Sequence, residues 1–317
     1  MNTPITASHL RPSVYLSLST DAESALGELR KLIASWRSAP HNKTPPHYPI
    51  GEAACWRQLV EGGWHHAGLD LGDDGVTRFR DLIAFSELLG SEQVALPAIG
   101  TLLAHRWMHV LGTDALASAA PDAPLSVALP VSPTSALVPF GRSTMTLVQR
   151  ERDGQFALVR FDANYQTKDD GFAQTLPLLS VQTSAVLDER LLREAVLLYV
   201  ASAVGCADRC LWRAVEYARE RKAYGQPIGS FQAIKHMLAD MYRDTELARS
   251  GVIGAEHETE WLPLVTHCVE LARRVTAHSI QVHGGIGFTW DAGLHFHTRH
   301  VLAVSKLVTS VTAFANG

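Results

Sequence analysis

The last third of the sequence carries the pattern that most constrains the fold. After Asp188, apolar residues recur every three or four positions, as in the stripe of Leu192, Val196 and Tyr199. This is the period of an amphipathic α-helix. Four such segments, at about 188–222, 230–250, 258–282 and 291–313, are separated by short connections. Long helices joined by short connections predict an antiparallel four-helix bundle.

Two regions with other sequence patterns precede the bundle. Residues 1–119 are mostly helix-like, and we expect the helix containing SELLGSE to end at Gly90, where glycine suits a left-handed cap. Residues 120–183 contain short β-rich runs, SVALPV, MTLVQRE, FALVRF and LLSVQT, which predict a small antiparallel β domain. The sequence therefore predicts an α+β protein with a helical domain at 1–119, a β domain at 120–183 and a bundle at 184–317.

Composition excludes several classes of protein. The 28 Lys and Arg residues nearly balance the 32 Asp and Glu residues. The net charge of -4 therefore provides no positive electrostatic field that would attract nucleic acid. With four cysteines and a start that lacks a basic and apolar leader pattern, we expect a reduced, cytoplasmic protein. The most apolar stretch, residues 195–207, is shorter than the ~20 residues of a membrane span. It predicts a buried core helix.

Two motifs carry most of the chemical information. In the first, Glu216–Arg249, Arg221 stands at a helix end before a turn that includes Tyr224, where its guanidinium could meet a pyrophosphate through two hydrogen bonds. In the second, Gln281–Phe288, two adjacent glycines could let a ligand approach the backbone. Taken alone, such an arginine is usually solvated and such a glycine run is usually a helix connection.

Together the two motifs resemble the acyl-CoA dehydrogenase family. That family has ERxxFGxPIxxFQxxxxxLADM in the first position and QxxGGxG in the second, and each matches here without a gap. The resemblance implies FAD as cofactor, an acyl-CoA thioester as substrate, α,β-dehydrogenation as the reaction and an electron-transfer flavoprotein or similar acceptor. It also implies that the ADP half of FAD in a neighbouring subunit is held by Arg221, Tyr224, Gln232, Gln281, Gly284 and Gly285.

The departures from the family concern the catalytic base. The family's usual base position falls on Val308, which cannot take a proton, and the alternative position on the first bundle helix falls on Ala195. Glu194 is one residue away, about 100° around the helix. The β domain also lacks the family's threonine-glutamate-proline and glycine-serine-aspartate run beside the flavin ring.

This chain keeps the residues that bind the ADP half of FAD and lacks those beside the flavin ring. In this it resembles the non-catalytic subunit of bacterial heterotetrameric, steroid-type acyl-CoA dehydrogenases. We therefore expect a chain active only with a homologous catalytic subunit, and a steroid side chain as a candidate substrate. Two alternatives remain open. One is a self-sufficient homo-oligomeric dehydrogenase that uses Glu194 as its base, and the other is a flavin-free helical scaffold.

Two further groups of residues have simpler interpretations. His295, His297 and His300 do not share a helix face and have no fourth ligand suitably spaced, so we predict no metal site. Cys206 and Cys210 lie on one face of an apolar helix and are predicted to be small core residues.

Overall fold

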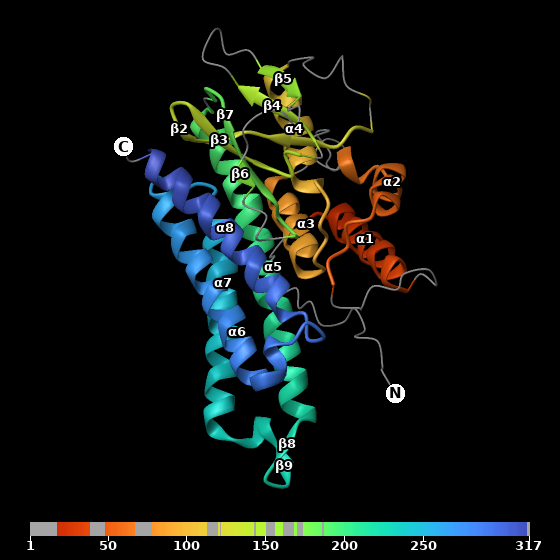
Figure 1. Ribbon diagram of the computed structural model, residues 1–317, viewed down its shortest axis with the longest axis vertical. Helices are drawn as coiled ribbons and strands as arrows, with labels where there is room; N and C mark the ends of the chain where they lie inside the picture. The colour runs from red at the N-terminus through yellow and green to blue at the C-terminus, as the bar shows by residue number, and fades with distance from the viewer. Residues whose placement is uncertain are drawn as a thin grey trace.

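The computed structural model describes residues 18–38, 48–66, 78–112, 120, 122–142, 144–149, 156–160, 168–169, 174–185 and 187–315. Four long helices form the C-terminal bundle: α5 (Glu189–Glu220), α6 (Gln232–Gly254), α7 (Trp261–His283) and α8 (Leu294–Ala315). Each begins and ends within about five residues of its predicted bounds. The bundle is the long body of the molecule, and the strands of the middle region lie at one end of it (Figure 1).

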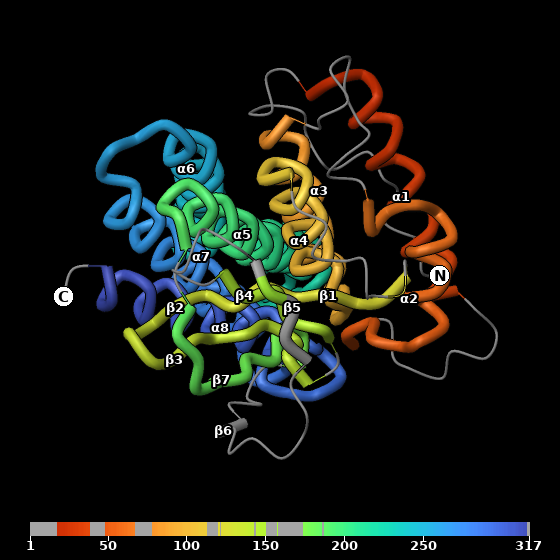
Figure 2. The backbone as a smooth tube through the Cα atoms, turned by 90° about the horizontal axis from the view of Figure 1, so that it is seen from above, coloured from red at the N-terminus to blue at the C-terminus, as the bar shows by residue number. Residues whose placement is uncertain are grey.

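The N-terminal helices pack against α5. They are α1 (Thr20–Ser38), α2 (Ala53–Glu61), the short 3₁₀ helix η2 (Trp64–His66), α3 (Phe79–Ser91) and α4 (Ala98–Leu111). Seen along the bundle, α5 lies between α3 and α4 on one side and α6 and α7 on the other (Figure 2). α5 is thus the common core element, and it is the described helix whose length and composition would allow a membrane crossing. Of the most apolar segment of α5, 89% is buried inside the protein, which confirms the predicted core helix.

Glycines permit a very close crossing of α3 and α5. A Cβ atom on Gly90 would lie 1.9 Å from the Ser202 carbonyl oxygen, and one on Gly205 would lie 1.9 Å from the Glu87 carbonyl oxygen. The prediction that Gly90 forms a left-handed cap was therefore wrong. α3 continues to Ser91, and Gly90 is needed for backbone contact between two helices.

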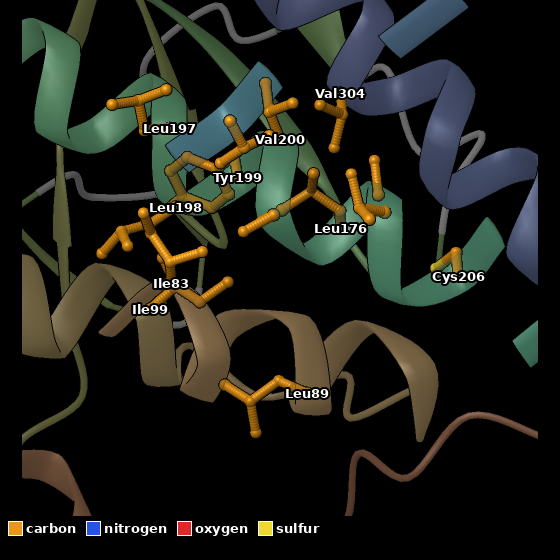
Figure 3. Close-up of a cluster of buried hydrophobic side chains, with 14 of the residues drawn as sticks. Ile83, Leu89, Ile99, Leu176, Leu197, Leu198, Tyr199, Val200, Cys206 and Val304 are labelled. Atoms are coloured by element: carbon orange, nitrogen blue, oxygen red, sulfur yellow. The ribbon is translucent and has the colours of Figure 1, made fainter. Parts of the chain in front are cut away.

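One continuous apolar cluster joins these layers. Figure 3 shows Ile83 and Ile99 of the N-terminal helices beside Leu198 and Tyr199 of α5, with Val304 of α8 nearby. The helix stripes read from the sequence face this shared core, so burial of apolar surface is the main force that orients α5. Asp188 begins α5 by accepting a hydrogen bond from the Arg190 backbone N–H at 2.9 Å.

The middle region forms two small sheets. β1 (Leu125–Val127), β4 (Met145–Gln149) and β5 (Phe156–Arg160) form the first, in the order β1-β4-β5. The second contains β2 (Leu129–Ser132), β3 (Ser135–Pro139), β6 (Lys168–Asp169) and β7 (Leu178–Gln182), in the order β2-β3-β7-β6.

The predicted β region is confirmed in outline, with three differences in detail. β1 pairs with β4 in parallel, whereas we predicted only antiparallel pairs. The run SVALPV does not form one strand but supplies parts of β1 and β2, and β3 was not predicted. The α+β fold is confirmed, while the exact domain boundaries at 119 and 183 remain predictions.

Candidate functional site

A tight hairpin follows α5 and carries the first predicted site residues. Arg221 leaves the helix in an extended conformation, and its backbone N–H still bonds to the Tyr217 carbonyl at 2.8 Å. β8 (Lys222–Ala223) pairs with β9 (Gln226–Pro227) across a two-residue turn. Tyr224 and Gly225 both have positive φ, 52° and 80°, as a type I′ turn requires. Tyr224 is 97% exposed at the tip.

The chain then enters α6 with the next predicted residue. A short 3₁₀ helix, η3 (Ile228–Ser230), connects the hairpin to Gln232, the first residue of α6. The Ile228 N–H bonds to the Arg221 carbonyl at 2.7 Å, which folds this connection back onto the end of α5. Arg221 and Gln232 are both exposed, so their side chains are available to a ligand or to another chain.

The second motif lies at the end of α7. Gln281 is exposed in the last turn, and Gly284 ends the helix with φ 63° and ψ −141°, a conformation that favours glycine. A Cβ on Gly284 or Gly285 would meet no atom within 4 Å, whereas one on Gly287 would lie 2.7 Å from the Ile280 carbonyl oxygen. Gly287 is therefore a packing residue, while the backbone at Gly284 and Gly285 faces open space.

Side-chain contacts bring the two motifs to the same end of the bundle. The ring of Tyr217, one turn before Arg221, stacks on His283 with centroids 4.5 Å apart. Figure 1 shows the β8–β9 hairpin at the end of the bundle that lies away from the strands. We call the surface formed by residues 221–232 and 281–290 the open end of the bundle.

Three apolar residues of the open end were missed in the sequence. Ile286 is 51% exposed, Phe288 76% and Trp290 53%. Ile286 and Phe288 belong to the 3₁₀ helix η4 (Gly284–Phe288), and Trp290 follows it. Large apolar side chains exposed together mark a contact surface for another molecule. The sequence signal that could have identified this surface is the presence of aromatic residues in the short connection that follows the paired glycines.

The open end has the chemistry needed for the ADP half of FAD. Within the part of the chain that the structure describes, Arg221 makes no ion pair, so its guanidinium can meet a pyrophosphate. The amides of Gln232 and Gln281 supply donors and acceptors. The uncrowded backbone at Gly284 and Gly285 would admit a ligand closely. Individual contacts of these residues with FAD remain predictions.

The two residues onto which the resemblance places the family's base lie in the apolar interior. Val308 of α8 is 1% exposed and Ala195 of α5 is fully buried. Neither side chain can accept a proton. The interior here contains no ionisable group at either position at which the family places its base.

Glu194 is buried and held in an ion pair. Arg106 of α4 donates from Nε to Oε2 at 3.1 Å and from Nη2 to Oε1 at 3.3 Å. Arg190 lies 3.6 Å from Oε1 on the solvent side. In the structure Glu194 is thus part of a buried ion pair.

The histidines and cysteines of the bundle make structural contacts. His300 bonds to Ser202 at 2.8 Å and to Thr175 at 3.0 Å, and burial lowers its pKa to about 4. Throughout the described ranges, no three His, Cys, Asp or Glu side chains are grouped to hold a metal ion. Cys206 and Cys210 are buried, which confirms them as core residues, and the Cys206 thiol donates to the Gly90 carbonyl at 3.3 Å.

Comparisons with known proteins agree with this architecture. Residues 185–306 match the model of the acyl-CoA dehydrogenase C-terminal domain. The chain is 32% identical over 273 residues to the acyl-CoA dehydrogenase IpdE2 of Mycobacterium tuberculosis, a match that covers 82% of this chain and 83% of the relative.

Two solved structures share the fold over nearly the whole chain. The ChsE4-ChsE5 complex from Mycobacterium tuberculosis has a TM-score of 0.75 at 21% identity, covering 95% of this chain and 96% of that chain. A variant of the Tcur3481-Tcur3483 steroid ACAD has a TM-score of 0.71 at 20% identity, covering 93% and 98%. With the extent of the IpdE2 match and the two motifs at one end of the bundle, this chain belongs to the acyl-CoA dehydrogenase family of oxidoreductases.

Proposed function

We propose that this chain completes the FAD site of a homologous catalytic subunit, in a heteromeric enzyme that dehydrogenates an acyl-CoA thioester between its α and β carbons. The observation that carries this proposal is a contrast within the chain. The residues suited to the ADP half of FAD are exposed at the open end, while Val308 and Ala195 fill both base positions with buried apolar side chains.

In this proposal the chain contributes binding and orientation. Arg221 would hold the pyrophosphate as a two-pronged cation, which a point charge cannot reproduce. Gln232 and Gln281 would bond to the ribose or adenine edge, and Tyr224 would contact the cofactor from the hairpin tip. Gly284 and Gly285 would allow close backbone approach. FAD, when bound, accepts a hydride from the β carbon.

The partner would supply the base that removes the α proton. A general base contributes roughly 10² to 10⁴ in rate, so a chain without one has little activity of its own. The exposed Ile286, Phe288 and Trp290 support burial of the open end against that partner. An electron-transfer flavoprotein or a similar protein would take the electrons.

A steroid side chain is the substrate class we propose. The ChsE4-ChsE5 structure is a complex of two different chains, and the Tcur3481-Tcur3483 structure is a steroid ACAD. The free, buried cysteines are compatible with the reduced cytoplasm, where we propose the enzyme acts.

Flavin absorbance tests the proposal directly. The chain is purified alone and after co-expression with candidate homologous subunits, and each preparation is assayed for bound flavin and for acyl-CoA oxidation. We expect little flavin and no turnover from the chain alone, and both from one mixed complex. Steady turnover by the chain alone would favour the homo-oligomeric alternative with Glu194. A flavin-free chain in every mixed complex would favour the scaffold.

A further inference from the structure

Four arginines from two helices converge beside the end of α3. Arg30 and Arg37 lie seven positions apart on α1, and Arg209 and Arg213 lie four positions apart on α5, so each pair shares a helix face. Glu92, just after α3, lies between the pairs. Its carboxylate is 3.6 Å from Arg37 Nε and 3.9 Å from Arg209 Nη1.

Among the described residues, the arginines of this cluster outnumber the carboxylates that lie near them. Arg37 lies within electrostatic range of Arg209, and Arg213 within range of both. The carboxylates that oppose them are Glu92 and, beside Arg213, Glu216. Burial and the neighbouring arginines lower the pKa of Arg37 and of Arg213. His297 is buried next to these cations, and burial holds its pKa well below the usual value, so it carries no charge at neutral pH.

Backbone carbonyls fix the orientation of two of the guanidinium groups. Arg37 donates to the carbonyls of Tyr48 and Glu92, and Arg213 donates to the carbonyl of Ala292. Carbonyls orient a guanidinium without neutralising it. In the described part of the chain, the buried Arg30 Nε has no hydrogen-bond partner. The cluster is therefore a half-buried, oriented group of cations in which the Arg30 Nε donor is unused within the described residues.

We propose that the arginine cluster binds an oxyanion of the phosphate class, either pyrophosphate itself or the phosphate chain of a nucleotide. Planar guanidinium groups bind phosphate oxygens through paired hydrogen bonds, and partial burial strengthens such bonds relative to water. The cluster uses other residues than the open end does, and Arg209 precedes Arg221 by about 18 Å along α5, although Arg213 approaches the open end through its bond to Ala292. The proposal therefore does not depend on the FAD role of Arg221.

Calorimetric titration of the full chain carrying Arg221→Ala with pyrophosphate, at constant ionic strength in chloride, tests the site, because this background removes the pyrophosphate ligand proposed at the open end. We expect saturable binding of one anion per chain. Arg209→Gln should weaken binding about tenfold or more, since Arg209 is the more solvent-accessible partner of Glu92 and its loss should leave the fold intact. Arg219→Gln is the matched control, because Arg219 is exposed on the same helix outside the cluster.

A second variant separates binding from general destabilisation. Glu92→Gln removes the carboxylate that competes for the arginines, so it should tighten pyrophosphate binding several-fold. A parallel titration of the Arg221→Ala chain with ADP, repeated with Arg209→Gln added, identifies the source of the phosphate group: a nucleotide ligand is indicated if ADP binds more tightly than pyrophosphate in a manner that needs Arg209, and a free anion if it binds less tightly. The proposal is overturned if pyrophosphate fails to saturate, if Arg209→Gln binds as the wild type does, or if Glu92→Gln weakens binding.

Discussion

Glycines occur both in the interior between α3 and α5 and at the open end of the bundle, but their neighbours differ completely. Gly90 and Gly205 press against the backbone of the opposite helix, where there is no room even for a methyl group. Gly284 and Gly285 have no such neighbour within 4 Å. The interior glycines serve packing within the chain, whereas the open-end glycines leave space that the chain itself does not fill. The same contrast separates the buried Val308 from the exposed Arg221.

The largest expected effect tests the open end. In the proposed mixed complex, Arg221→Ala should weaken FAD binding by ~2 to 4 kcal/mol, or roughly 30- to 1,000-fold, because charge-assisted bonds to the pyrophosphate are lost. Arg221→Lys should recover only part of the affinity. Flavin retention after dialysis measures the effect. Arg219→Ala is the control, and wild-type retention in Arg221→Ala would remove the open end from the cofactor site.

A substitution in the packed interior should have an almost equally large effect, but on the free energy of unfolding. Gly205→Ala should destabilise the fold by ~2 to 3 kcal/mol or more, because the new methyl group overlaps the Glu87 carbonyl and the helices must separate. Gly285→Ala, which places a methyl group in open space, should change the free energy of unfolding by less than ~0.5 kcal/mol. Urea unfolding of both variants measures the difference. Equal effects would mean that the two regions do not differ as described.

Acid should weaken the interior through His300. Its pKa of about 4 in the folded chain lies below the usual value of about 6.5, so the unfolded chain binds the proton first as the pH falls. The stability that a neutral His300 contributes is complete above pH 6.5 and is lost as the pH falls from 6.5 to 4. The loss in the free energy of unfolding reaches ~2 kcal/mol at pH 5. Urea unfolding at pH 7.5 and pH 5 should show a smaller loss in His300→Gln than in the wild type. An unchanged loss would exclude His300 as the source.

The smallest effect concerns Glu194. Since Arg106 already binds this carboxylate, Glu194→Gln should change turnover of an active complex by less than about tenfold, or ~1.4 kcal/mol. Steady-state kinetics at saturating acyl-CoA would measure it, with circular dichroism to confirm folding. A thousandfold loss would instead identify Glu194 as the base and make the chain catalytic.

Local periodicity predicted the bundle well because each helix buries one stripe. It failed where the decisive partner is distant in sequence. The parallel pairing of β1 with β4 depends on strands 20 positions apart, as in the pair Leu125 and Met145, and no local signal records it. Glu194 meets Arg106 across 88 positions. Gly90 looked like a cap because glycine at a helix end usually has that role, and its true neighbour is Ser202 on another helix.

The candidate site was predicted from two motifs, and its role in FAD binding remains a prediction. The two motifs indicated which residues to place at the open end, because arginine, glutamine and glycine have distinctive chemistry. The exposed Phe288 and Trp290 were not predicted, since the sequence does not reveal which aromatic residues stay uncovered. Exposure is a property of the whole packed chain.

The crossing of α3 and α5 also determines when the chain can fold during synthesis. The contact between Cys206 and Gly90 spans 116 positions, and the intervening chain includes the β region. Twelve of the thirteen residues of α3 are buried in the finished protein. Until α5 has left the ribosome, α3 has no partner for most of its apolar surface. The N-terminal half should therefore emerge as an incompletely folded, aggregation-prone intermediate that depends on chaperones. Its productive folding should begin only after α5 has been translated.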